Sequence, residues 1–400
     1  MRYPTMIAST LCVLATASLG ADGHGHGNDR PIDCSRRSLA EAVASADENE
    51  EIRFTGACAG PIVIRTDGLS LEGVGTAVID GGGEDVILVD GASGVSLSTF
   101  AVRNGGNGIV GDNGAHMTMT GLNVHDNAGT GITIQTASSA ALTDVTIAQN
   151  GFIGLEAHGG SSLIVHGTVN TTNNRVFGVN INGSSFTIDR ATTVSSTGNA
   201  LGIQVSTNAN AFLADPSATI NANDNLATGL TVVSGAQLVS FGGVINATGN
   251  GGIGVSVSSK AGLDLDAGSV LTASNNGDGL LVQTGSVMSV FNTPQNSGIP
   301  GFSTIEAKNN TRTGVRVLTD ARLTLVNQAK VTAQQNGTVG FTADNGAGVT
   351  LVNSTLTGNT ARDLVMTFGV RADLRTLVVG TVTCDATVLV RGTSGIFCPM

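Results

Sequence analysis

Residues 127–134 read NAGTGITI, and residues 150–157 read NGFIGLEA. Both stretches place an Asn four residues before a Gly, and both continue with an alternating apolar run. The frame recurs in eleven copies between residues 104 and 366, although the Asn stands three residues before the Gly in two copies and Asp363 replaces the Gly in the last. These Gly or Asp positions are 23 to 27 residues apart except for one interval of 35. Self-similarity at a nearly fixed period indicates a repeat architecture, in which each repeat stacks on the next.

The residues inside one repeat predict strands. Residues 131–150 hold three short segments, GITIQTASS, AALTD and VTIAQN, rich in β-branched residues and in period-two alternation. The chain has 56 Gly and no Trp, a composition that disfavours helices and suits short strands joined by tight turns. We therefore expect an all-β, single-domain fold: a right-handed parallel β-helix with three strands per turn, each paired with its equivalent one period later.

The repeated Asn is predicted to be structural. A tight bend between strands needs a residue that tolerates the left-handed region, as Asn and Gly do. Stacked at one bend, Asn side chains can also hydrogen-bond along the axis of the coil. The predicted ladder consists of Asn104, Asn127, Asn150, Asn174, Asn199, Asn225, Asn250, Asn276, Asn310, Asn336 and Asn359.

The open ends of such a coil must be covered. Residues 35–50, SRRSLAEAVASADENE, form one amphipathic helical pattern, with Ser38 as N-cap and Glu41 three residues later. We expect this helix, within an N-terminal cap of residues 34–60, to cover the first turn. The last rungs and a cap, residues 361–400, are expected to close the other end.

Four cysteines lie in pairs near the two ends of the predicted domain. In an exported chain an even number favours disulfides, most simply Cys34–Cys58 and Cys384–Cys398. Zinc binding is the alternative, but the spacings of these cysteines match no compact zinc knuckle.

The N-terminus resembles an export signal. Arg2 precedes the apolar run MIASTLCVLATASLG, which ends in small residues. We expect a signal peptide at residues 1–20, a flexible Gly/His leader at 21–33 and the β-helix at 34–400. The predicted location is secreted, either extracellular or periplasmic, and no later segment is apolar enough for a membrane helix.

The net charge of −11 restricts the partners. Proteins that bind nucleic acid cluster Lys and Arg against phosphate, and this chain does not predict such binding. The same acidity argues against an anionic membrane surface.

The capping helix, the stretch IRFTGACAGPIVIRTDGLSLEGVG at residues 52–75 and the N-x3-G-[ILV]-x-[ILV] rungs together resemble the pectin-lyase-like superfamily of right-handed parallel β-helices. The resemblance covers about residues 34–398. It implies the fold, whereas the superfamily includes lyases, polygalacturonases, epimerases, tailspikes and adhesins, so function must be argued from the site.

The catalytic patterns that this resemblance suggests are missing. Polygalacturonase-like enzymes need paired acidic residues beside the Gly, and here only Asp278 directly precedes a rung Gly. Gly-His-Gly occurs only around His24 and His26 in the leader, and Arg-x-Lys is absent. The resemblance also implies that a lyase would use a Ca²⁺-binding Asp cluster beside a basic residue. The three lysines, Lys260, Lys308 and Lys330, lie in no such cluster, so we expect no cofactor or metal, with Ca²⁺ as the exception if the protein is a lyase.

Positions two and four after each Gly should point outward, and one stretch of five rungs is rich in polar residues there. This candidate ligand-binding set consists of Asp112, Gln135, Glu156, His158, Asn180, Asn182 and Gln204. Glu156 and His158 lie two residues apart on one face, so they could share a proton or bind a cation with Asp112. The alternative is a solvated sheet face, since exposed strand positions are polar in any case. A second set, Asp278, Arg312 and Arg316, is expected to be an exposed ion-pair cluster.

These observations favour a non-enzymatic extracellular or surface protein that binds polysaccharide, cell-surface glycan or another partner along its polar sheet face. The alternative is a divergent polysaccharide lyase or glycoside hydrolase acting on an acidic polysaccharide.

Overall fold

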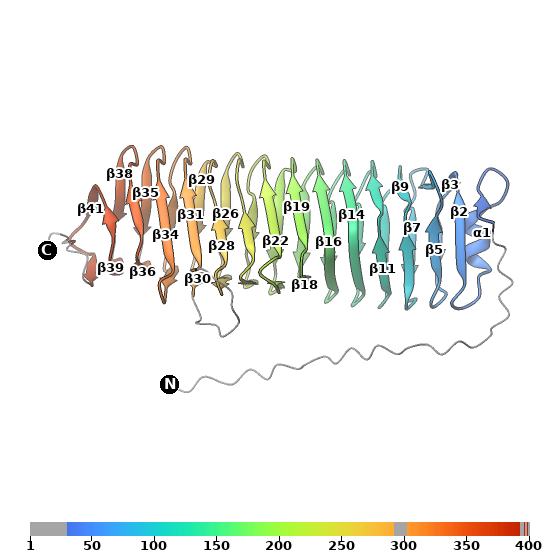
Figure 1. Cartoon of the computed structure of the whole chain (residues 1–400), viewed down its shortest axis with the longest axis horizontal. Coiled ribbons are helices and arrows are strands. Elements are labelled where there is room, and N and C mark those ends of the chain that lie inside the picture. The colour runs from blue at the N-terminus through green and yellow to red at the C-terminus, as the bar shows by residue number, and fades with distance from the viewer. Residues whose placement is uncertain (1–29, 292–301, 393–395, 397, 399–400) are drawn as a thin grey trace, which may run out of the picture. The chain divides into compact units, whose positions relative to one another are not determined.

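The structure is a computed structural model that describes residues 30–291, 302–392, 396 and 398. The described residues from 31 onward form one compact unit, and that unit is a long parallel coil (Figure 1). The expected signal peptide lies outside the described residues, as does the leader apart from residues 30–33, so both boundaries remain predictions. Within the described residues, no helix is long and apolar enough to cross a membrane.

Each turn of the coil contributes strands to three rows, and every pairing between successive turns is parallel. The first row is a sheet of 14 strands: β4 (Ile62–Ile64), β7 (Ile87–Asp90), β10 (Ile109–Asp112), β13 (Ile132–Ile134), β15 (Leu155–His158), β17 (Phe177–Asn182), β20 (Leu201–Ser206), β23 (Leu230–Val232), β26 (Ile253–Val257), β29 (Asp278–Val282), β32 (Val315–Leu318), β35 (Val339–Asp344), β38 (Arg362–Met366) and β41 (Val382–Cys384).

The other two rows are joined into one hydrogen-bonded network, because two long strands run through both. The second row contains β2 (Glu51–Thr55), β5 (Ser70–Gly73), β8 (Val95–Ser98), β11 (His116–Thr120), β14 (Ser139–Ala148), β16 (Ser162–Thr172), β18 (Ser185–Ile188), β21 (Asn210–Leu213), β24 (Gln237–Phe241), β27 (Gly262–Asp266), β30 (Val287–Val290), β33 (Arg322–Leu325), β36 (Gly348–Val352), β39 (Arg371–Arg375) and β42 (Leu389–Arg391). The third row contains β3 (Ala57–Ala59), β6 (Val78–Asp80), β9 (Ala101–Arg103), β12 (Asn123–His125), the distal halves of β14 and β16, β19 (Thr193–Thr197), β22 (Thr219–Asn223), β25 (Val244–Asn246), β28 (Val270–Thr272), β31 (Thr304–Lys308), β34 (Lys330–Gln334), β37 (Thr355–Thr357) and β40 (Val378–Val379), while β1 (Ile32–Asp33) pairs with β2. The prediction of a right-handed parallel β-helix with three strands per turn is confirmed.

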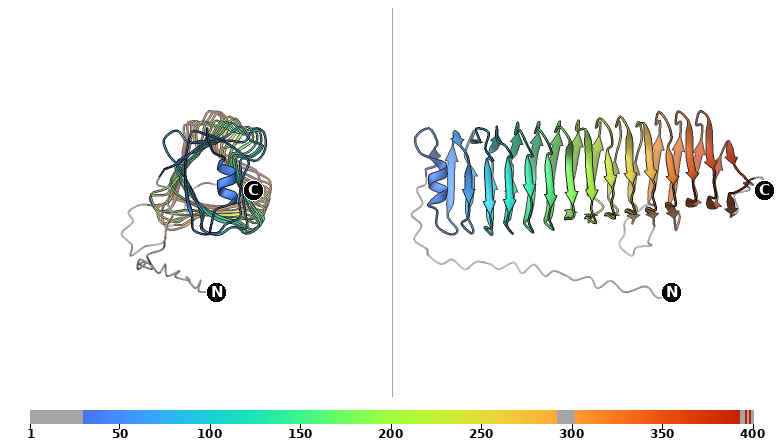
Figure 2. Two further views of the ribbon diagram at one scale, coloured as in Figure 1. Left: turned by 90° about the vertical axis from the view of Figure 1, so that its right-hand side faces the viewer. Right: turned by 180° about the vertical axis from the view of Figure 1, so that it is seen from behind.

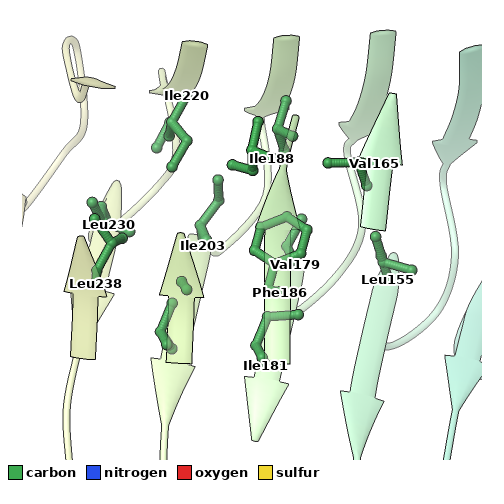
Figure 3. Packing of buried hydrophobic residues seen from close by; sticks show 14 of the residues in the cluster. Leu155, Val165, Val179, Ile181, Phe186, Ile188, Ile203, Ile220, Leu230 and Leu238 are labelled. Carbon is green, nitrogen blue, oxygen red and sulfur yellow. The ribbon is translucent and has the colours of Figure 1, made fainter. Parts of the chain in front are cut away.

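The core is a set of stacked aliphatic columns. Ile132, Leu155 and Val179 are aligned in register on β13, β15 and β17, and none of the three is exposed to solvent. Figure 3 shows how such side chains from successive turns fill the interior. Since full burial of one such side chain stabilises the fold by about 1.5–3 kcal/mol, repetition along the coil provides most of its cohesion.

The N-terminal end is covered by α1 (Leu39–Ala44), which lies across the open end of the coil when the coil is viewed along its axis (Figure 2, left). Ser38 caps the helix, because its Oγ accepts the Glu41 N–H at 3.2 Å. The helix is shorter than the pattern over 35–50 predicts. The Ser45 hydroxyl and the Ser45 N–H both donate to the Glu41 carbonyl at the end of the helix, and beyond it the Asp47 N–H donates to Glu50 Oε2 and not to a helical carbonyl.

Both predicted disulfides are present. Cys34–Cys58 ties the segment before α1 to β3, and Cys384–Cys398 ties β41 to the chain's last residues. The zinc alternative is therefore wrong for these cysteines. Parts of the expected C-terminal cap, residues 393–395, 397 and 399–400, lie outside the described residues.

A continuous asparagine ladder runs inside one corner of the coil. Asn199 is typical of its members: its backbone N–H and its Nδ2 both donate to Oδ1 of Asn225 in the next turn, at 3.1 and 3.2 Å. The same Nδ2 also donates to the Thr171 carbonyl of the preceding turn at 3.1 Å. The members are Asn127, Asn150, Asn174, Asn199, Asn225, Asn250, Asn276, Asn310, Asn336 and Asn359. Their amides satisfy the backbone groups that a corner leaves unpaired.

Asn104 does not belong to the ladder, so this prediction is wrong. The Gly105 N–H donates to Asn127 Oδ1 at 2.9 Å, whereas Asn104 is exposed and donates to Asp80 Oδ2 at 2.7 Å. The cause is a corner one residue shorter than the next one. The register is offset by 22 residues where Arg103 meets His125 and by 23 where Ile109 meets Ile132.

The predicted reason for the Asn also needs correction. The ladder asparagines do not have positive φ; the residue before each one does, for example Gln149 at 56° and Asp224 at 52°. Asn104, at 56°, occupies that left-handed position. The rung Gly is required by close approach, because a Cβ on Gly229 would lie 2.6 Å from Asn250 Nδ2.

Candidate functional site

The outward side of the first row carries the seven predicted ligand-binding residues, and we call these seven residues the polar face. Six of them lie on β10, β15, β17 and β20, and Gln135 directly follows β13. The register confirms the predicted columns, since Glu156 pairs with Asn180 and Asn180 with Gln204. His158 is likewise aligned with Asn182. Neighbouring strands lie about 4.8 Å apart, so these side chains can contact the next turn directly.

One column of the polar face is a hydrogen-bonded chain. Asn180 Nδ2 donates to Glu156 Oε1 at 3.0 Å, and Gln204 Nε2 donates to Asn180 Oδ1 at 3.2 Å. Asn180 is only 6% exposed, so it links its two neighbours and offers little surface to a ligand. Glu156 and Gln204, which are half-buried, present the accessible polar atoms at the two ends.

The other column is built around Asp112. The hydrogen bond with Thr136 has the largest effect on the pKa of this carboxyl and lowers it. Burial has the next largest effect and raises the pKa, but the Asn113 N–H, the Gln135 side chain and the charge of His158 add to the lowering, so the net direction is downward. The N–H of Asn113 donates to Asp112 Oδ1 at 2.8 Å. Asp112, Gln135 and His158 thus share one electrostatic environment, in which Asp112 is an ionised acceptor at neutral pH.

The polar face extends one strand further toward the N-terminus than the sequence predicts. Asp90 is aligned with Asp112, and it accepts hydrogen bonds from Arg65 Nε at 2.9 Å and from Asn113 Nδ2 at 2.7 Å. The repeat frame does not reach this strand, which explains why Asp90 was missed. The alternation ILVD of residues 87–90 was the available signal.

A preformed metal site is not part of this arrangement. Among the residues that the structure describes, no three His, Cys, Asp or Glu side chains are grouped so that they could hold a metal ion. The polar face is therefore a surface of hydrogen-bond donors and acceptors, and the suggested cation site between Asp112, Glu156 and His158 is not assembled in it.

The second predicted set is an ion-pair cluster in which Asp278 is buried, contrary to the expectation, while the side chains of Arg312 and Arg316 remain 59% and 37% exposed. Asp278 Oδ2 lies 2.8 Å from Arg312 and 3.2 Å from Arg316, and its side chain is only 3% exposed. Its Oδ1 accepts the Thr313 N–H at 3.1 Å. A carboxylate so enclosed is held for structural reasons, because removing its partners would leave a buried charge unpaired.

Comparisons with known proteins address the fold. No protein-family model matches the sequence, and no curated protein matches it. Among solved structures, the A-module of the Azotobacter vinelandii mannuronan C-5 epimerase AlgE4 is similar over 88% of this chain and 93% of that module, with a TM-score of 0.51 and 14% identity. This likeness shows the parallel β-helix fold. The catalytic unit of a GH87 α-1,3-glucanase from Streptomyces thermodiastaticus is also similar, over 93% of this chain and 69% of that one, with a TM-score of 0.40 and 14% identity.

Proposed function

We propose that this β-helix is an exported, non-enzymatic protein that binds glycan along its polar face. The supporting observation is the pair of side-chain columns, one running Glu156–Asn180–Gln204 and the other built around Asp112. Carboxylate and amide groups held in fixed positions suit sugar hydroxyls, which both donate and accept hydrogen bonds. Preorganisation by neighbouring turns also reduces the entropy lost when a ligand binds.

The chemistry of Asp112 favours binding over glycoside hydrolysis. A hydrolase needs one carboxylic acid whose pKa is raised, so that it can protonate the glycosidic oxygen. The pKa of Asp112 is lowered, chiefly by the Thr136 hydroxyl, so this residue is ionised where a general acid must carry a proton. The polygalacturonase-like and Ca²⁺-dependent lyase patterns described above are also missing from the sequence.

Export is supported by the two disulfides, which persist in oxidising compartments. A coil tied at both ends suits an extracellular or periplasmic setting, and the glycan partner would be a polysaccharide or a cell-surface glycan.

A glycan array tests the proposal, with the unaltered protein compared to the double variant Glu156→Ala/His158→Ala. The matched control is Ser256→Ala/Ser258→Ala, which changes the equivalent positions on β26 and directly after it. We expect the unaltered protein and the control to bind a common glycan, and the first variant to lose it with unchanged circular dichroism. An array on which the unaltered protein binds nothing would refute the proposal.

The lyase or hydrolase alternative has its own test. Incubation with uronate polysaccharides, with and without Ca²⁺, should give no new ultraviolet absorbance from double bonds and no new reducing ends. A clear rise in ultraviolet absorbance or in reducing ends with one substrate would show that the protein is an enzyme and would refute the non-enzymatic proposal.

A further inference from the structure

A groove lies on the outward side of the second row near the C-terminal end of the coil, away from the polar face on the first row. It has a volume of about 620 Å³ and crosses four successive strands, β33, β36, β39 and β42. We call it the C-terminal groove. Figure 1 shows β36 and β39 in the last turns of the coil.

The floor of the C-terminal groove is open because the residue there, Gly348, has no side chain. Arg322, Gly348 and Arg371 are aligned in register on adjacent strands. Gly348 does not have a positive φ, so its backbone does not require glycine. A Cβ there would meet Arg322 Cγ at 3.4 Å, an ordinary contact. The glycine thus leaves a space between two arginines two turns apart, about 10 Å along the axis.

The groove carries unneutralised positive charge. Arg322, Arg371 and Arg391 line it and are exposed, and within the described part of the chain none of the three forms an ion pair. Asp373, the one carboxylate in the lining, is already held by Arg375, with Nε to Oδ1 at 2.9 Å.

The C-terminal part of the coil as a whole has a positive net charge. Residues 302–392 contain nine Lys and Arg against six Asp and Glu, a net charge of +3, in a chain whose net charge is −11. A local excess of positive charge on an acidic protein makes the electrostatic potential in the groove positive, and this potential attracts anions.

We infer that the C-terminal groove is a second binding site, for a segment of a polyanionic polysaccharide. Guanidinium groups pair with carboxylate and sulfate through paired N–H donors, and Thr324 and Thr350 in the lining add hydroxyls for the sugar itself. No aromatic side chain lines the groove, so it lacks the stacking platform that single-stranded nucleic acids use.

The inference is tested by affinity electrophoresis and calorimetry on the full chain, with polygalacturonate for carboxylate, dextran sulfate for sulfate and neutral dextran as reference. The groove variant is Arg322→Gln/Arg371→Gln. The control is Arg36→Gln/Arg190→Gln, which removes equal charge from side chains 83% and 81% exposed outside the groove. We expect the groove variant to bind the polyanion about tenfold more weakly or worse, and the control to bind normally.

A second variant tests whether binding needs the open floor of the groove in addition to its positive charge. Gly348→Gln fills the floor and keeps every arginine, and Ser185→Gln places the same side chain in the same column on β18. Weaker binding by Gly348→Gln alone, together with a steep fall of affinity in salt, supports the inference. Equal losses in the groove variants and their controls, equal binding of dextran, or preference for duplex DNA over both polyanions would overturn it. Because Glu156 and His158 are untouched, the outcome is independent of the polar face.

Discussion

The side chain of Asn359 donates from Nδ2 to Oδ1 of Asp363 at 2.8 Å, and this contact ends the asparagine ladder. The Asn359 N–H donates to the same oxygen at 3.0 Å, while Oδ2 accepts the Thr381 N–H at 2.7 Å. The backbone N–H of each earlier ladder Asn donates to Oδ1 of the Asn in the next turn, so the last one needs an acceptor that a further Asn would otherwise supply. A carboxylate is the strongest acceptor available, and hydrogen bonds in such a chain strengthen one another.

Replacing Asp363 should therefore remove the hydrogen-bond acceptor at the end of the ladder. Asp363→Ala removes a side chain that is only 4% exposed and leaves the Asn359 N–H and the Thr381 N–H without their acceptor. Asn359 Nδ2 loses one acceptor and keeps the Ala333 carbonyl. We expect a loss of about 2–4 kcal/mol, read by denaturant unfolding. Asp363→Asn should cost less, because its one oxygen can still accept from Asn359.

The same contact predicts a pH dependence. Burial raises the pKa of Asp363, but the hydrogen bonds from Thr381 and Asn359 outweigh it, so the pKa is lowered in the folded state. Its contribution is therefore present above the unfolded value of 3.8 and is lost as the pH falls through the folded value. The stability difference between the unaltered protein and Asp363→Asn should shrink in acid, and a difference that is constant with pH would contradict this assignment.

The ladder can be tested with two residues that share one sequence motif. Asn225→Ala should cost about 2–4 kcal/mol, because it leaves the N–H of Asn199 without an acceptor in the interior and removes one of the acceptors of Asn199 Nδ2. Asn104→Ala should cost under about 1 kcal/mol, because Asn104 is exposed and lies outside the ladder. Comparable losses in thermal unfolding would show that the register of the first corner is wrong.

The contribution of Asp264 on β27 to stability should change with pH in the opposite direction to that of Asp363. Burial raises its pKa despite hydrogen bonds from Ser289 and Gln237, and the charge of Asp266 adds to the increase. A raised folded-state pKa gives stability that is present below the unfolded value and lost as the pH rises through the folded value. Asp264→Asn should thus raise the Tm by about 1–2 °C at pH 7 and have a smaller effect near pH 3.5. An equal effect at both pH values would be inconsistent with this sign.

Much of the fold is predictable from the sequence because each turn repeats one local rule. The period, the inward columns such as Ile132 and Ile134, and both disulfides follow from spacing and alternation. The role of Asn104 was not predictable, because a one-residue shortening within a corner leaves the N-x3-G motif unchanged while it shifts the register. The burial of Asp278 also depends on where arginines of the next turn lie, which the sequence does not give.

The polar face was predictable as a set of outward positions, because strand alternation fixes the side of each residue. Which members remain accessible was not predictable, since Asn180 is enclosed by its neighbours in adjacent turns. The C-terminal groove was missed for a similar reason. Arg322 and Arg371 are 49 residues apart in the sequence, and only the stacking of turns brings them to the two sides of Gly348.

Glycan binding by the polar face is tested most directly by carboxyl footprinting of the full chain. A water-soluble carbodiimide with a glycine ester labels accessible carboxylates, and peptide mass spectrometry locates the labels with and without the strongest array glycan. We predict that the glycan protects Asp112 and Glu156, while Asp344 on β35 of the same sheet is labelled to the same extent in both samples. Unchanged labelling of Asp112 and Glu156 at saturating glycan, or protection only at Asp344, would contradict the account.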